Sequence, residues 1–191
     1  ISNGNSNIGT IINEGVINSS HTINDTGSIQ DKTNDAISLN TITDVVTAIS
    51  NSGGINGNVR VAGNSEVDLI QNSKVIAGCI ILEGGRIGKI DNTNGATANC
   101  MSFSNGASVD NLNNSGTIKD KITNNSGSIT VNNSGRGFIG GITTSGGGTT
   151  NISNGGFKNP GGDIGFITNN DNSTTNIIEW NVGNPDNPNS P

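Results

Sequence analysis

Aromatic residues are scarce in this chain of 191 residues: they make up 3% of it, and tyrosine is absent. Hydrophobic residues as a whole reach only 29%. A layered core of ordinary composition would contain more Leu, Phe and Trp than this. Charged residues are also few, at 13%, unlike the highly charged chains that are typical of disorder. The composition therefore excludes an ordinary globular core without indicating a disordered chain.

A net positive charge and long apolar runs are missing as well. The net charge is -6, whereas nucleic acids and anionic lipids are bound by basic patches. No stretch approaches the roughly 18 to 20 apolar residues that span a membrane. We therefore expect no nucleic-acid partner and no direct insertion of this segment into a membrane.

The residues that are abundant are Asn, Gly, Ser and Thr, and the apolar residues are mostly Ile and Val. Ile, Val and Thr favour strands, whereas Gly and Asn favour turns. Residues 9–32 divide into the units GTIINE, GVINSS, HTINDT and GSIQDK, with Ile in the same slot of each. Further along, three apolar pairs alternate at a spacing of eight residues: Val59/Val61, Val67/Leu69 and Val75/Ala77. Short strands separated by sharp corners, repeated in this way, are typical of a β-solenoid.

The predicted fold is all-β, a parallel β-helix in which each coil covers the apolar face of the next. Three units per coil give about 18 to 24 residues a coil and roughly eight or nine coils, with strands of about three to five residues. The variable unit length favours a right-handed helix over the left-handed hexapeptide type, whose period is strict. We expect a single solenoid domain over 1–180, as a fragment of a longer protein, and a Pro/Asn-rich linker or tail over 181–191.

Asn-Ser-Gly triplets are predicted to form the corners, because Gly and Asn tolerate positive φ. Stacked Asn side chains can then hydrogen-bond from coil to coil. Ile118, Ile129 and Ile139 follow such triplets at spacings of eleven and ten residues, so we assign them to the core. Replacement of Ile118 or Ile129 by Asn should then be strongly destabilising.

Residues 28–52 contain neither Gly nor Pro, and two interpretations stay open for them. Ile42, Val45, Val46 and Ile49 have helical spacing, which predicts a short helix near 35–50. The β-branched residues of the same segment predict a further wall of the solenoid instead.

Cys79 and Cys100 are 21 residues apart, about one coil, and are predicted to lie side by side on one face. A disulfide between adjacent coils and two free thiols in a core slot both fit this spacing. Trp180, the single tryptophan, is predicted to plug the open end of the solenoid, with Phe157 and Phe166 beside it. The alternative for Trp180 is an aromatic that stacks on a sugar.

No residue set resembles a reaction centre. The single histidine, His21, occupies a slot that elsewhere holds Gly, which favours a corner position, and no Gly-x-Ser-x-Gly elbow accompanies it. One His and two Cys are too few for a zinc site. We expect no enzyme activity, no metal and no cofactor.

The repeats Asn-Ser-Gly-Thr-Ile at 114–118 and Asn-Ser-Gly-Ser-Ile at 125–129, in a Gly/Asn/Ser/Thr-rich chain, resemble bacterial autotransporter passenger domains. The Asn-rich composition is similar to surface proteins of Campylobacter and Helicobacter relatives. The resemblance implies secretion to the bacterial cell surface or beyond, and a role as a stalk or adhesin with a glycan or protein receptor on a host cell. Two alternatives stay open: a carbohydrate-active β-helix or phage-tail protein, and a filament or surface-layer repeat that associates end to end.

Overall fold

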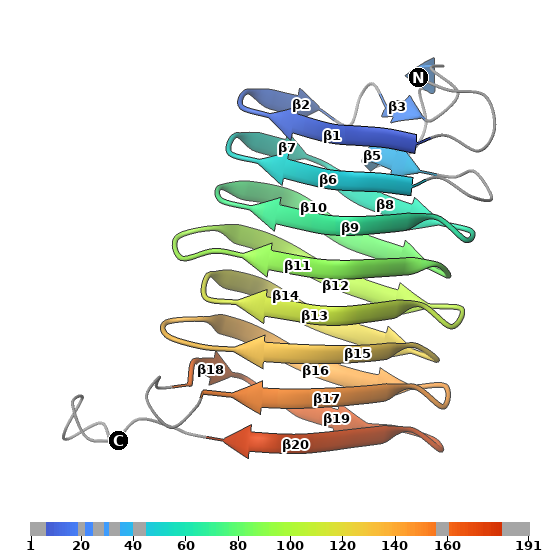
Figure 1. The fold of residues 1–191 in the computed structure, drawn as a ribbon. Helices are drawn as coiled ribbons and strands as arrows, with labels where there is room; N and C mark the ends of the chain where they lie inside the picture. The colour runs from blue at the N-terminus through green and yellow to red at the C-terminus, as the bar shows by residue number, and fades with distance from the viewer. Residues whose placement is uncertain are drawn as a thin grey trace.

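The computed structural model describes residues 7–18, 22–24, 29–30, 35–39, 45–155 and 161–180. These residues form a parallel β-solenoid in which two sheets face each other and the coils stack along one axis (Figure 1). The all-β, parallel solenoid predicted from the repeats is therefore confirmed, whereas its right-handed winding stays a prediction.

Sheet A has eight strands, all parallel to their neighbours. In order they are β1 (Asn7–Asn13), β6 (Val45–Asn51), β9 (Glu66–Asn72), β11 (Arg86–Asn92), β13 (Ser108–Asn114), β15 (Ser128–Asn133), β17 (Thr149–Asn154) and β20 (Thr174–Trp180).

Sheet B forms the opposite wall and has twelve strands. Its longer members are β5 (Asp35–Leu39), β8 (Asn58–Ala62), β10 (Val75–Glu83), β12 (Thr97–Ser104), β14 (Thr117–Asn125) and β16 (Phe138–Ser145). Its shorter members are β2 (Val16–Asn18), β3 (Thr22–Asn24), β4 (Ile29–Gln30), β7 (Gly54–Asn56), β18 (Asp163–Ile164) and β19 (Ile167–Asn169). Among the described strands, only β3 and β4 pair antiparallel.

The solenoid has about six turns, so the prediction of eight or nine coils is wrong. The predicted coil length is close, because successive coils from Asn51 to Asn154 are 19 to 22 residues apart. Part of the difference arises at the N-terminal end, where the stacked Asn13 and Asn51 are 38 positions apart, nearly twice the usual coil length. The predicted strand length is also wrong: strands β9 to β17 have six to nine residues, because a coil has two walls rather than three.

The core lies between the two sheets and consists of columns of inward side chains. Ile118 on sheet B and Ile129 on sheet A are 0% and 1% exposed. Ile118 and Ile139 are Cα partners in adjacent coils, whereas Ile129 lies on the opposite wall between them. The spacing of ten to eleven residues in the sequence is therefore half a coil.

The helix predicted near 35–50 is wrong for the described residues, which form β5 and β6. Val46 and Ile49 both point into the core although three residues separate them. Strand β6 accommodates this spacing with one extra outward residue, and β9, β11 and β13 carry the same irregularity in register. A repeated strand irregularity thus produced the apparent helical period.

The same irregularity puts the two residues of one of the three alternating pairs on different faces. Val59 and Val61 are both buried, as the period of two predicts. In the pair Val67/Leu69, Val67 is buried but Leu69 is partly exposed. Leu69 is the Cα partner of Lys89, which faces outward. Val75 is 42% exposed and belongs to the outer face of sheet B.

A ladder of buried asparagines runs along one corner of the solenoid. It consists of Asn13, Asn51, Asn72, Asn92, Asn114, Asn133 and Asn154, the last residue of each sheet A strand from β1 to β17. From Asn13 to Asn133, each Nδ2 donates to Oδ1 of the asparagine in the next coil, at 2.8 to 2.9 Å, and Asn154 Nδ2 donates to the carbonyl of Gly162. The same Nδ2 atoms also donate to backbone carbonyls at the beginning of sheet B strands, as Asn92 does to Thr117. The ladder therefore satisfies the buried amides and joins the two sheets at the corner.

Candidate functional site

Cys79 and Cys100 form a disulfide between β10 and β12. They are Cα partners in adjacent coils, with their Cα atoms 4.5 Å apart. Both are only partly buried and lie on the outer face of sheet B, at a register shift of β10 against β12. The alternative of two free thiols in a core slot is therefore wrong, because the core positions beside them belong to Ile80 and Met101.

Loss of this disulfide should weaken the fold without unfolding it, since inward side chains and the backbone ladder hold β10 against β12. Replacing both cysteines by alanine should lower the free energy of unfolding by roughly 3 kcal/mol, mainly by releasing a loop of about 20 residues in the unfolded chain. Urea denaturation followed by circular dichroism measures the change. A reducing agent should lower the free energy of unfolding of the native protein by the same amount and leave that of the double variant unchanged. Loss of the β signal on reduction at zero denaturant would contradict this expectation.

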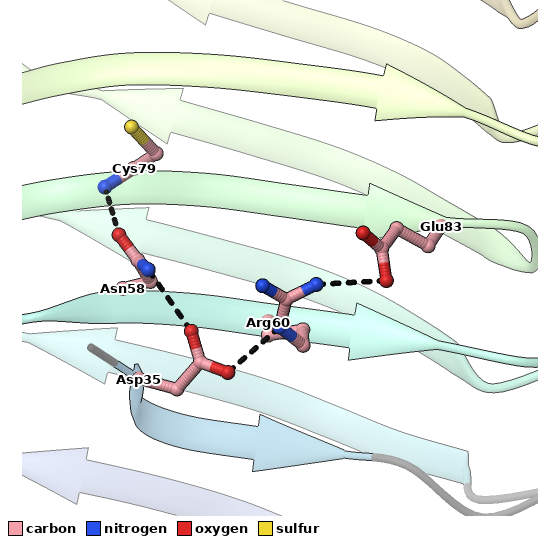
Figure 2. A network of polar contacts seen from close by, with 5 residues as sticks. All are labelled: Asp35, Asn58, Arg60, Cys79 and Glu83. Atoms are coloured by element: carbon pink, nitrogen blue, oxygen red, sulfur yellow. Dashed lines mark hydrogen bonds and ion pairs between the residues drawn. The ribbon is translucent and has the colours of Figure 1, made fainter. Parts of the chain in front are cut away.

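A polar network connects Cys79 to the first coils of sheet B (Figure 2). The backbone N–H of Cys79 donates to Asn58 Oδ1 at 2.9 Å, and Asn58 Nδ2 donates to Asp35 Oδ1 at 2.9 Å. Arg60 donates to Asp35 and to Glu83, at 2.7 Å each. The network spans β5, β8 and β10, so it ties three neighbouring strands together.

The charge of Arg60 is balanced within this network. Burial disfavours the guanidinium, but its hydrogen bonds and charge interactions with Asp35 and Glu83 outweigh burial and raise the pKa of Arg60. The Asp35 side chain is only 3% exposed, whereas that of Glu83 is 41% exposed. Arg60 therefore matters mainly as the partner of a buried carboxylate.

Replacing Arg60 by methionine should cost about 1 to 3 kcal/mol, because it leaves the buried Asp35 carboxylate with fewer compensating partners. Replacing Glu83 by glutamine should cost less than about 0.5 kcal/mol, because that ion pair is solvent-exposed. Thermal and urea unfolding of both variants would measure the difference. Equal effects would mean that Asp35 does not depend on Arg60.

A second ion pair joins the outer faces of two sheet A strands. Arg86 on β11 contacts Asp110 on β13, and this hydrogen bond is the main cause of the raised pKa of Arg86. Lys89 pairs with Asp91 at 2.6 Å on β11 itself. The side chains of Arg86, Asp110 and Lys89 are exposed and that of Asp91 is partly buried, and Asp110 also accepts a hydrogen bond from Ser108 Oγ at 3.5 Å.

These clusters consist of carboxylates paired with guanidinium or ammonium groups. Within the described ranges, no group of three or more His, Cys, Asp or Glu side chains could hold a metal ion. His21 lies outside the described residues. The network of Asp35, Arg60 and Glu83 joins carboxylates to a guanidinium and ties β5, β8 and β10 together.

Sequence reasoning did not find this network. Its members are 25 and 23 residues apart because they are not Cα partners: Arg60 pairs with Ser38 and Ile81, so a fixed coil length does not superimpose the charged residues. One pattern in the sequence could have indicated the network. Three successive coils each contribute one charged residue, and the sign of the charge alternates: Asp35, Arg60 and Glu83.

The predicted plug, Trp180, ends strand β20 and is the Cα partner of Asn154. It thus occupies the next position of the asparagine ladder and is 42% exposed. Ile177 and Ile178 on the same strand are 55% and 67% exposed. Phe166 lies elsewhere, over Gly141 on the outer face of sheet B, and Phe157 is outside the described residues. Phe166 is therefore not part of an end plug.

Comparison of the chain with protein-family models, with curated proteins and with solved structures finds no match. Among the described residues, no helix is long and apolar enough to cross a membrane.

Proposed function

We propose that this chain is a non-enzymatic module of a bacterial autotransporter passenger, right-handed and exposed at the cell surface, where it acts as a stalk or as part of an adhesin. The observation that carries the proposal is the stack of coils, which share one continuous core and one asparagine ladder. Such a stack makes a stiff rod whose length grows with coil number, and it leaves both outer faces free for contact. The disulfide between coils supports an oxidising, extracytoplasmic location.

Surface display provides the test. The 191-residue chain is fused to an autotransporter translocator in a non-adherent bacterium, and adherence to epithelial cells is counted. An adhesin raises adherence above that of the translocator alone. A matched fusion with the Ile129→Asn variant, which we expect to be unfolded or strongly destabilised, shows whether the folded solenoid is required. Adherence equal to the translocator alone would contradict the adhesin role.

The stalk role has its own readout, because a rod moves whatever follows it away from the cell. A small tag at the outer end of the displayed chain should be labelled by an antibody even when surface polysaccharide shields the same tag on the translocator alone. Equal shielding would contradict the stalk role. A polysaccharide-cleavage screen with the purified chain covers the enzymatic alternative, and turnover would overturn the non-enzymatic proposal.

End-to-end association is a second candidate, favoured by one feature of β20. This strand is at the end of sheet A, carries the exposed Ile177, Ile178 and Trp180, and contains no Lys or Pro of the kind that blocks edge pairing. Sedimentation of the chain with and without residues 175–191 tests it. A filament-forming chain shows a mass that rises with concentration only when these residues are present, and a monomer under both conditions would exclude the candidate.

A further inference from the structure

The exposed phenylalanines gather on one part of the outer face of sheet B. Phe138 begins β16 and is 39% exposed, and Phe166, between β18 and β19, is 48% exposed. The equivalent outward position is Val75 in β10, Thr97 in β12 and Thr117 in β14, so Phe138 places an aromatic ring in a column of smaller β-branched side chains. In a chain with so few aromatics, two large apolar rings left in water on the same face indicate a contact surface.

The surface between these rings has no side chains of its own. A Cβ at Gly140 would overlap the carbonyl oxygens of Lys119 and Asp120, and one at Gly165 would overlap the carbonyl of Gly140. Stacked backbone therefore forms the floor, and only glycine fits there. Hydrogen bonds of 2.9 Å from Gly165 N to Ile139 O and 2.8 Å from Ile142 N to Phe166 O hold the segment that carries Phe166 on this floor.

Three cations that form no ion pair with another described residue border the same floor. Lys119 and Lys121 are exposed on β14, and Lys121 is the Cα partner of Gly141, which the Phe166 ring covers. Arg136 is exposed at the corner two residues before Phe138. Within the described part of the chain, Arg60, Arg86 and Lys89 form ion pairs, whereas Lys119, Lys121 and Arg136 form none.

The charge balance of this surface is opposite to that of the whole chain. Three cations face two exposed carboxylates, Asp120 and Asp163, whereas the net charge of the protein is -6. A ligand that fits must present a flat apolar face to the phenylalanine rings and the glycine floor, and negative charge to the rim. The hydrophobic face of a pyranose ring with a carboxylate substituent meets both requirements.

We propose that the outer face of sheet B over β14, β16 and β18–β19, the Phe138/Phe166 surface, binds an acidic polysaccharide. Sugar rings lie against Phe138 and Phe166, and Lys119, Lys121 and Arg136 bind the carboxylates. This assignment rests on the proposed adhesin function and names its ligand class.

Binding of the purified chain to alginate, hyaluronate, polysialic acid and polygalacturonate is measured by isothermal titration calorimetry. At least one of these polyanions should bind, and its affinity should fall as salt is raised from 50 to 500 mM, because screening weakens the charge contacts. Methyl-esterified polygalacturonate, which keeps the sugar rings and loses the charge, serves as the neutral probe. It should bind at least tenfold more weakly than polygalacturonate if the latter is a ligand.

Two variants and two controls locate the site on the protein. Phe138→Ala/Phe166→Ala and Lys119→Gln/Lys121→Gln should each weaken binding at least tenfold, with unchanged circular dichroism and melting temperature. Lys74→Gln removes an exposed cation elsewhere, and Val75→Ala trims an exposed apolar residue in the same column as Phe138. Both controls should bind like the native chain.

Three results would overturn the proposal: no binding to any of the four polyanions, equal binding by the site and control variants, or equal affinity for poly-glutamate, which would indicate an acidic protein partner. Failure here is distinguishable from failure of the adhesin function. If cells that display Phe138→Ala/Phe166→Ala adhere as well as cells that display the native chain, adhesion uses another face of the solenoid. If cells that display the native chain do not adhere either, the adhesin function itself is wrong.

Discussion

Replacing Asn92 by alanine is expected to lower the free energy of unfolding by about 3 to 5 kcal/mol. Asn92 is 1% exposed, accepts a hydrogen bond from Asn72 Nδ2 and donates to Asn114 Oδ1 and to the carbonyl of Thr117. Removal of the Asn92 amide takes one acceptor from Asn72 Nδ2 and one donor each from Asn114 Oδ1 and the Thr117 carbonyl. A buried polar group that loses its partner costs about 1 to 3 kcal/mol. Urea denaturation followed by circular dichroism measures the loss.

The matched control for Asn92 is Asn111→Ala. Asn111 is also in a sheet A strand, but it is exposed on the outer face. Its replacement should change the free energy of unfolding by less than about 0.5 kcal/mol, as is usual for surface positions. If Asn92→Ala is as stable as Asn111→Ala, the ladder does not contribute to the stability of the corner.

Replacing Ile129 by asparagine is the second large expected effect, at about 3 to 5 kcal/mol. Ile129 is 1% exposed and stacks between Val109 and Thr150 in a column that runs through the core. Asparagine has a smaller apolar volume and brings an amide into a position that offers no ladder partner. The melting temperature by circular dichroism should fall sharply, and Ile118→Asn on the opposite wall should behave alike.

The neighbouring substitution Ser128→Asn is the control, because it introduces the same side chain at an exposed position instead of a buried one. Ser128 precedes Ile129 and is exposed, so the same new side chain there points into water. We expect a change of less than about 0.5 kcal/mol. Equal melting temperatures for Ile129→Asn and Ser128→Asn would show that the inward and outward faces are assigned wrongly.

The parallel solenoid could be predicted because its two causes are local. Corners need residues that tolerate positive φ, and Asn105, Gly84 and Gly106 adopt it in the structure. Stacking needs the same residue class at the same place in each coil, which makes the repeat visible in the sequence. The closeness of Cys79 and Cys100 follows from this period alone, since their separation of 21 residues is one coil.

The number of walls and coils could not be predicted in the same way. The hexads at the N-terminal end favoured three short sides, but Ile11 belongs to sheet A while Ile17 and Ile23 belong to sheet B strands. The half-coil spacing between Ile118, Ile129 and Ile139 was the better signal for two walls.

The outward-facing sites were the hardest to predict, because polar outer faces place few constraints on sequence. Strand irregularities shift the phase within β10, β12 and β14, so alternation does not tell whether a residue such as Lys121 faces the core or water. Phe166 was predicted to join the end plug, since aromatic side chains are more often buried, and no pattern in the sequence singled out Phe138. Only the register of the coils brings them near the same glycines.

The asparagine ladder also gives the solenoid a polarity. All six amide–amide bonds run in the same sense, with the donor toward the N-terminus and the acceptor toward the C-terminus. The side-chain dipoles are therefore aligned and polarise one another along the axis, as in other chains of hydrogen bonds. A coil inserted upside down would place two amide nitrogens or two amide oxygens face to face. New coils inserted into this line by gene duplication can extend it only head to tail.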